Sequence, residues 1–65
     1  MPNAAALAAL DQEIAAVREN IRDLTEQAAA YSGAEDDELT SERIAEQEAL
    51  LARLLKDREA AAAAS

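Results

Sequence analysis

The feature that most constrains this chain is a strict alternation of three- and four-residue steps between apolar positions in its first half. Apolar residues at this spacing form one narrow stripe along an α-helix. The pattern therefore predicts a helix over about residues 4–31 that packs along a narrow seam, the line of contact with another helix. Eight seam positions are apolar across four heptads: Leu7, Leu10, Ile14, Val17, Ile21, Leu24, Ala28 and Tyr31.

This heptad does not continue into the second half of the chain. If the same register ran past Tyr31, the seam would receive several glutamates, and every later leucine would fall off it. A single long helix is therefore excluded, and the chain must turn between Tyr31 and Leu39. Gly33 is the only glycine, and it suits the left-handed residue that commonly follows the end of a helix. The sequence predicts an acidic turn at about residues 32–36.

A second helix is expected over about residues 35–62. At 100° per residue, its large apolar side chains spread over about 140° of the helix surface. A face this wide can contact the first helix and a second surface as well. The side chains that form it are Ile44, Leu50, Leu51, Leu54 and Leu55, and the same arc includes Arg43, Gln47 and Arg58.

The start of the second helix has two interpretations. Thr40 or Ser41 can cap a helix that begins near residue 41, whereas Ser32 and Glu35 fit an S-x-x-E capping box that starts it near residue 33. Either start gives two helices of similar length, as an antiparallel pair requires. The alanine-rich tail at residues 60–65 is expected to fray.

The composition supports an all-α fold. Nineteen of the 65 residues are Ala, Phe and Trp are absent, and β-branched apolar residues are too few for a sheet. We predict one unit over residues 1–65, an antiparallel two-helix hairpin that resembles a coiled coil. Because there is no Cys or His, neither a disulfide nor a structural zinc site can reinforce so small a chain. We therefore expect oligomerisation, or docking into a helical bundle, to complete the core.

The formal net charge of −8 excludes some partners. Residues 32–42 contribute five acids and no base, whereas residues 43–65 are balanced. An acidic chain repels phosphate backbones and anionic lipids, so neither nucleic acid nor a membrane is an expected partner. The lack of a basic leader and of a long apolar segment predicts a soluble, cytoplasmic protein. Heavy use of Ala and of Arg over Lys suggests a bacterial or phage gene, in which case the protein can be part of a virion.

Catalysis is not expected. An enzyme needs a nucleophile or base, a group that activates it and a pocket, and this chain has no His, no Cys and no evident partner for its hydroxyl groups. We expect no cofactor and no metal ion. The acidic run from Glu35 to Glu38 lacks the alternate spacing and the glycine of a calcium loop, and a solvated first turn is its simpler explanation.

These observations predict a protein–protein interaction module, a small scaffold or adaptor that forms a homo-oligomer or joins a larger assembly. Tyr31 would close the seam beside the turn. The residues expected to form the interface are Leu7, Leu10, Ile14, Val17, Ile21, Leu24, Tyr31, Ile44, Leu50, Leu51, Leu54 and Leu55.

The alternative function is that of an acidic inhibitor or decoy, which would occupy a basic site on an enzyme or a nucleic-acid-binding protein. The acidic side chains near the turn would then make the contacts. They are Glu35, Asp36, Asp37, Glu38 and Glu42.

Overall fold

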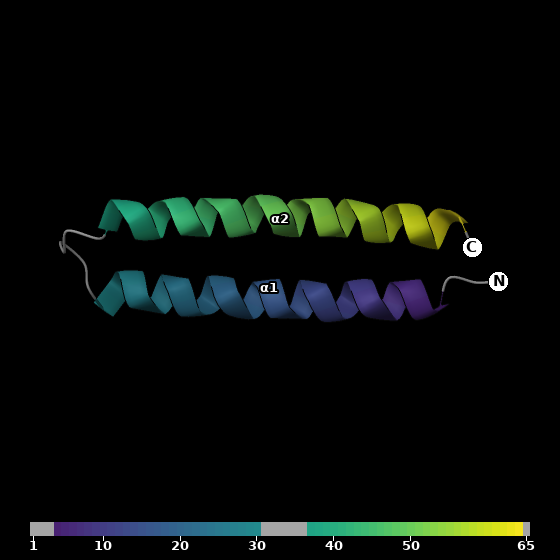
Figure 1. Ribbon diagram of the computed structural model, residues 1–65, viewed down its shortest axis with the longest axis horizontal. Coiled ribbons are helices and arrows are strands. Elements are labelled where there is room, and N and C mark those ends of the chain that lie inside the picture. Colours follow the sequence, from purple (N-terminus) through teal and green to yellow (C-terminus); the bar gives the residue numbers. More distant parts are fainter. Residues whose placement is uncertain (1–3, 31–36, 65) are drawn as a thin grey trace.

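The computed structural model describes residues 4–30 and 37–64. They form two α-helices, α1 over Ala4–Ala30 and α2 over Asp37–Ala64. The helices lie side by side and antiparallel, so that Ala4 and Ala64 are at the same end of the molecule (Figure 1). No strand occurs in these two ranges. The predicted all-α hairpin is confirmed.

The observed ends of α2 differ from those expected. The helix already includes Asp37, so a first turn capped by Thr40 or Ser41 is wrong, and the capping box at 32–35 lies outside the described residues. The four acids that begin near residue 35 favour an early start because acidic side chains complement the positive end of a helix. At the other end the helix continues to Ala64, since alanine has the highest helix propensity. The fraying expected for this tail stays a prediction.

The contact between the helices follows a heptad on both sides. In α1, the positions that are buried or half-buried match the predicted stripe, and all other described positions are exposed. Tyr31 and the turn around Gly33 lie outside the described residues. In α2, the corresponding positions again alternate in steps of four and three: Thr40, Ile44, Gln47, Leu51, Leu54, Arg58 and Ala61.

The core is thin. Ile14, Val17 and Leu54 are buried, each with 6–8% of its surface exposed, and no described side chain is completely enclosed. Leu10, Ile21 and Leu51 pack against this cluster. Each helix thus buries one stripe and leaves the rest of its surface in solvent.

The shape follows from this single contact. The Cα trace measures 51 × 14 × 10 Å, and its radius of gyration is 15.0 Å. A compact chain of this length would have a radius of about 11 Å. The accessible surface is 4766 Å², whereas a compact monomer of the same mass would expose about 4000 Å². The hairpin is a rod with an unusually large surface for its size.

Neither helix could cross a bilayer. Both exceed 18 residues, but within the described ranges no 18-residue window is apolar enough.

The adjacent leucines Leu54 and Leu55 provide a matched test of the seam. Leu54 is 6% exposed and Leu55 is 39% exposed. We expect Leu54→Ala to lower the free energy of unfolding by about 2–5 kcal/mol, because it opens a cavity in the core. Leu55→Ala should change it by about 0.5 kcal/mol or less. Urea denaturation followed by circular dichroism measures both, and equal losses would contradict this packing.

Candidate protein-interaction surface

The structure divides the predicted interface residues into two groups. Nine of them lie in the contact between α1 and α2, and Tyr31 lies outside the described residues. Leu50 and Leu55 point away from this contact and are 40% and 39% exposed. The nine in the contact are Leu7, Leu10, Ile14, Val17, Ile21, Leu24, Ile44, Leu51 and Leu54.

The exposed leucines of α2 do not form one patch. At 100° per residue, Leu50 and Leu55 lie about 140° apart, on opposite faces of the hairpin. Leu39 was not among the predicted interface residues. It is 49% exposed, and its direction from the helix axis is only about 20° from that of Leu50. The eleven-residue interval between Leu39 and Leu50, three helical turns, was the sequence signal for this pair. One face therefore has two exposed leucines and the other has one.

Three seam positions of α2 have polar residues, Thr40, Gln47 and Arg58, and two of these side chains contact a polar side chain of α1. Gln47 accepts a hydrogen bond at Oε1 from Nδ2 of Asn20 over 3.4 Å. Arg58 donates from Nε to Oδ1 of Asp11 over 2.5 Å and from Nη2 to Oδ2 over 3.5 Å. Each polar side chain thus reaches past the seam to a polar residue at the edge of α1, and the pair of Arg58 and Asp11 favours this register over one shifted by a heptad.

Arg58 is held in its charged form by its contact with Asp11. The hydrogen bond to Asp11, and then the negative charge of that carboxylate, raise the pKa of Arg58 above its usual value. Because the pKa of this cation is raised in the folded state, the contribution of Arg58 to stability is present below the ordinary arginine pKa and is lost as the pH rises through the raised value. Both side chains are about half exposed, so the pair specifies register more than it adds stability.

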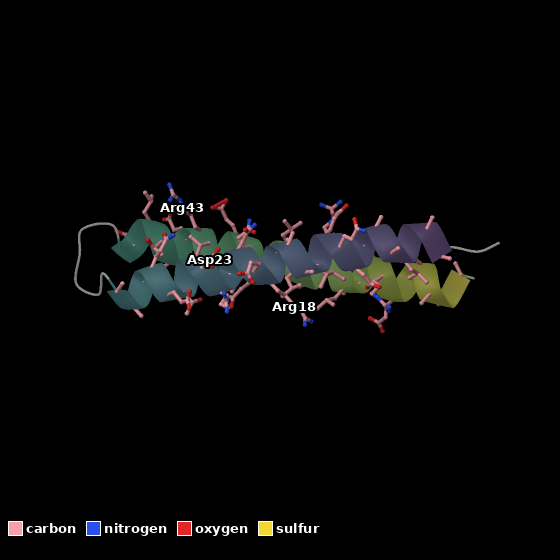
Figure 2. The ribbon with its side chains drawn as sticks, turned by 90° about the horizontal axis from the view of Figure 1, so that it is seen from below. Arg18, Asp23 and Arg43 are labelled. Atoms are coloured by element: carbon pink, nitrogen blue, oxygen red, sulfur yellow. The ribbon has the colours of Figure 1, made fainter. Side chains whose placement is uncertain are left out.

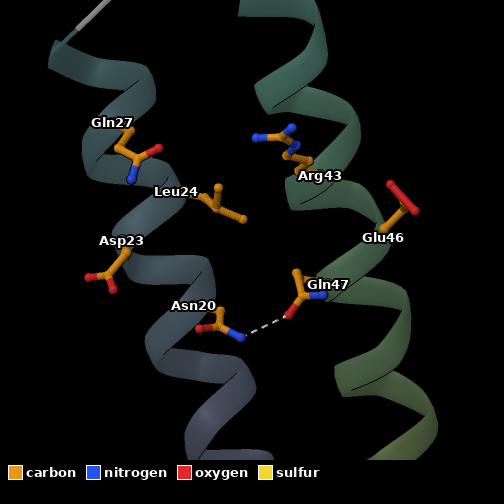
Figure 3. A pocket seen from close by; sticks show the side chains of 7 residues that line it. All are labelled: Asn20, Asp23, Leu24, Gln27, Arg43, Glu46 and Gln47. Carbon is orange, nitrogen blue, oxygen red and sulfur yellow. Dashed lines mark hydrogen bonds between the residues drawn. The ribbon is translucent and has the colours of Figure 1, made fainter.

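A shallow groove of about 370 Å³ runs along one face between the helices (Figure 3). It is open to solvent, and its lining is mostly polar or charged. We call this side of the hairpin the groove face and the opposite side the back face. The groove is lined by Asn20, Asp23, Leu24, Gln27, Arg43, Glu46 and Gln47.

The two faces differ in their charged groups. Figure 2 shows Arg43 projecting from the groove face and Arg18 from the opposite side. Helical periodicity places Leu39 and Leu50 on the groove face, and Leu55 on the back face with Asp11 and Arg18. The groove face therefore combines two exposed leucines with charges of both signs.

The acidic residues of the alternative function are only partly described. Glu38 and Glu42 are exposed in the first turns of α2, the backbone of Asp37 is helical, and the other two lie outside the described residues. Within the described ranges, no three acidic side chains gather closely enough to hold a metal ion.

No protein-family model, curated protein or solved structure matches this chain.

Gln47 offers a test of the polar seam. The register places it opposite Ile21, and we expect Gln47→Leu to raise the free energy of unfolding by about 1 kcal/mol, because more apolar surface is buried there. The exposed hydrogen bond to Asn20 that is lost contributes less. Chemical denaturation measures the change, with Asn20→Ala as the control that removes the hydrogen bond and leaves Gln47 in the seam, its gain in helix propensity being taken into account. A Gln47→Leu variant less stable than the natural chain would contradict this account.

Proposed function

We propose that this chain is a non-enzymatic protein–protein interaction module, a small helical scaffold or adaptor whose fold is completed by another protein surface. The observation that supports this most directly is the thin core together with three large exposed leucines on α2, Leu39, Leu50 and Leu55. Two helices that share one seam bury few side chains, and a small single core rarely contributes more than about 3–5 kcal/mol. A partner that covers the leucines supplies the missing apolar burial.

The charged flanks of the leucines select the partner. Arg43 and Glu46 lie on the groove face of α2, between Leu39 and Leu50 in the sequence, and both are exposed. Charges at the rim of an apolar contact contribute to orientation and specificity more than to affinity. The leucines thus supply binding energy, and the charges determine which surface fits.

The cellular setting of the proposal is a cytoplasmic complex or a phage particle. It is supported by the acidic, alanine-rich composition without Cys, which is compatible with a reducing compartment.

A dilution experiment tests whether the fold needs a partner. Circular dichroism and thermal melting are recorded over about a thousandfold range of protein concentration. Because binding stabilises only the folded state, we expect a weakly stable hairpin at low concentration, and stabilisation whenever its leucines are covered. A dilute monomer that melts cooperatively at high temperature, independently of concentration, would contradict the proposal.

Neutralising the acids separates this function from the decoy. In a variant with Gln or Asn at all five acidic positions near the turn, an assembly module keeps its association, because the leucines are unchanged. If the chain is a decoy, this variant no longer binds its basic target. Binding of that target by the natural chain should also weaken steeply as the salt concentration rises. Loss of association in this variant, with unchanged helix content, would overturn the assembly function in favour of the decoy.

A further inference from the structure

We propose that a second copy of this chain binds to the groove face, with the two α2 helices antiparallel and centred on Leu50. This inference rests on the proposed function and names the partner that covers two of the exposed leucines, Leu39 and Leu50.

The contact surface is a stripe along α2. Its residues are spaced in steps of four and three, so that they align on the groove face about 90° from the seam. All of them are exposed in the hairpin. The stripe comprises Leu39, Arg43, Glu46, Leu50, Arg53, Asp57, Ala60 and Ala64.

The charges on this stripe are complementary to those of the same stripe in an antiparallel second copy. If a two-fold axis passes through Leu50, the leucine meets its counterpart in the second copy. Arg43 then lies opposite Asp57 of the second copy, and Glu46 lies opposite Arg53 of the second copy. By symmetry each pairing occurs twice, and every charge on the stripe faces an opposite one. None of these four side chains forms an ion pair within the described part of the hairpin.

The axis also coincides with the middle of the helix. Leu50 lies at the centre of α2, which spans Asp37–Ala64. Two copies related about this point overlap along the full length of the helix, about 42 Å at 1.5 Å per residue. Leu39 then lies opposite the small Ala60 of the second copy, and the exposed apolar surface of both stripes is covered.

The back face does not fit a second copy in this way. The stripe of α2 around Leu55 includes Glu48 and Glu59, and no basic residue of α2 lies on it. Self-association through this stripe would gather carboxylates, and like charges across a contact are unfavourable. The groove face is therefore the one that suits self-association.

A parallel arrangement of the same two faces also pairs some charges. It would place α2 against α1 of the second copy, with Arg43 opposite Asp23 and Arg53 opposite Glu13. However, it would also bring together the first turns of the two α2 helices, where Glu38 and Glu42 are exposed and no basic residue of α2 precedes Arg43. In the antiparallel arrangement these turns are separated by far more than a Debye length of about 8–10 Å. The antiparallel arrangement has one unfavourable contact per copy, in which Glu13 lies opposite Asp23 of the second copy.

Charge reversal tests the pairing. In Arg53→Glu, residue 53 faces Glu46 of the second copy, and the dissociation constant measured by analytical ultracentrifugation should rise about tenfold or more. The double variant Glu46→Arg/Arg53→Glu should return to within about threefold of the natural chain. Both variants have Glu at position 53, four residues before Asp57, so any repulsion within the helix is the same in both. Restored association in the double variant therefore comes from the pairing across the interface. A double variant as weak as the single one would overturn the pairing.

Glu13→Gln distinguishes the two orientations. It removes a repulsion from the antiparallel dimer, which should bind more tightly, and an attraction from the parallel one, which should bind more weakly. Weaker binding by Glu13→Gln would overturn the antiparallel proposal.

Substitutions of Leu50 and Leu55, which are almost equally exposed, test which face of the hairpin binds the second copy. Leu50→Asp places two carboxylates on the two-fold axis and should abolish the dimer, whereas Leu55→Asp makes the same change on the back face and should leave it intact. Loss of the dimer in Leu55→Asp alone would overturn the assignment of the face. A chain that is weakly helical when dilute, and monomeric at every concentration, would overturn this inference while leaving the proposed assembly function in place.

Discussion

The contact of Ile14 and Val17 with Leu54 supports the rest of the structure. These three side chains are the only buried ones among the described residues, and they lie near the middle of both helices. With no aromatic residue in the described core and no cross-link available, the pairing of α1 with α2 depends on this short apolar seam. A contact so narrow leaves most of each helix in solvent, so the rod shape of the hairpin and the exposed leucines behind the proposed interaction have the same cause.

Polar residues limit how this seam can form. Gln47 and Arg58 interrupt the apolar stripe of α2, and a shift of one heptad would move Arg58 from Asp11 to Ala4 or Arg18, where it has no opposite charge. They reduce the apolar burial of an already thin core. The chain thus gives up some stability for a defined register, and that register holds the exposed leucines and charges in a fixed arrangement on the groove face.

The sequence predicted the helical hairpin well because apolar periodicity reports burial directly. Every described position of the first stripe lies in the seam. The second helix was harder to interpret because its leucines occur as adjacent pairs, and periodicity alone could not show which member of each pair faces α1. Leu51 and Leu54 do, whereas Leu50 and Leu55 flank them on opposite faces. Leu39 was missed because it lies apart from those pairs, and its alignment with Leu50 matters only once the seam is known.

Small-angle X-ray scattering of the full chain tests the central claim most directly, because one experiment gives both the mass and the longest dimension. Two hairpins stacked about Leu50 should have twice the mass of 6.9 kDa with a length close to the 51 Å of one hairpin. Scattering that shows a fully helical particle of 6.9 kDa at every concentration would contradict the account. A doubled mass in a particle much longer than one hairpin would contradict it as well, because the copies would then meet end to end.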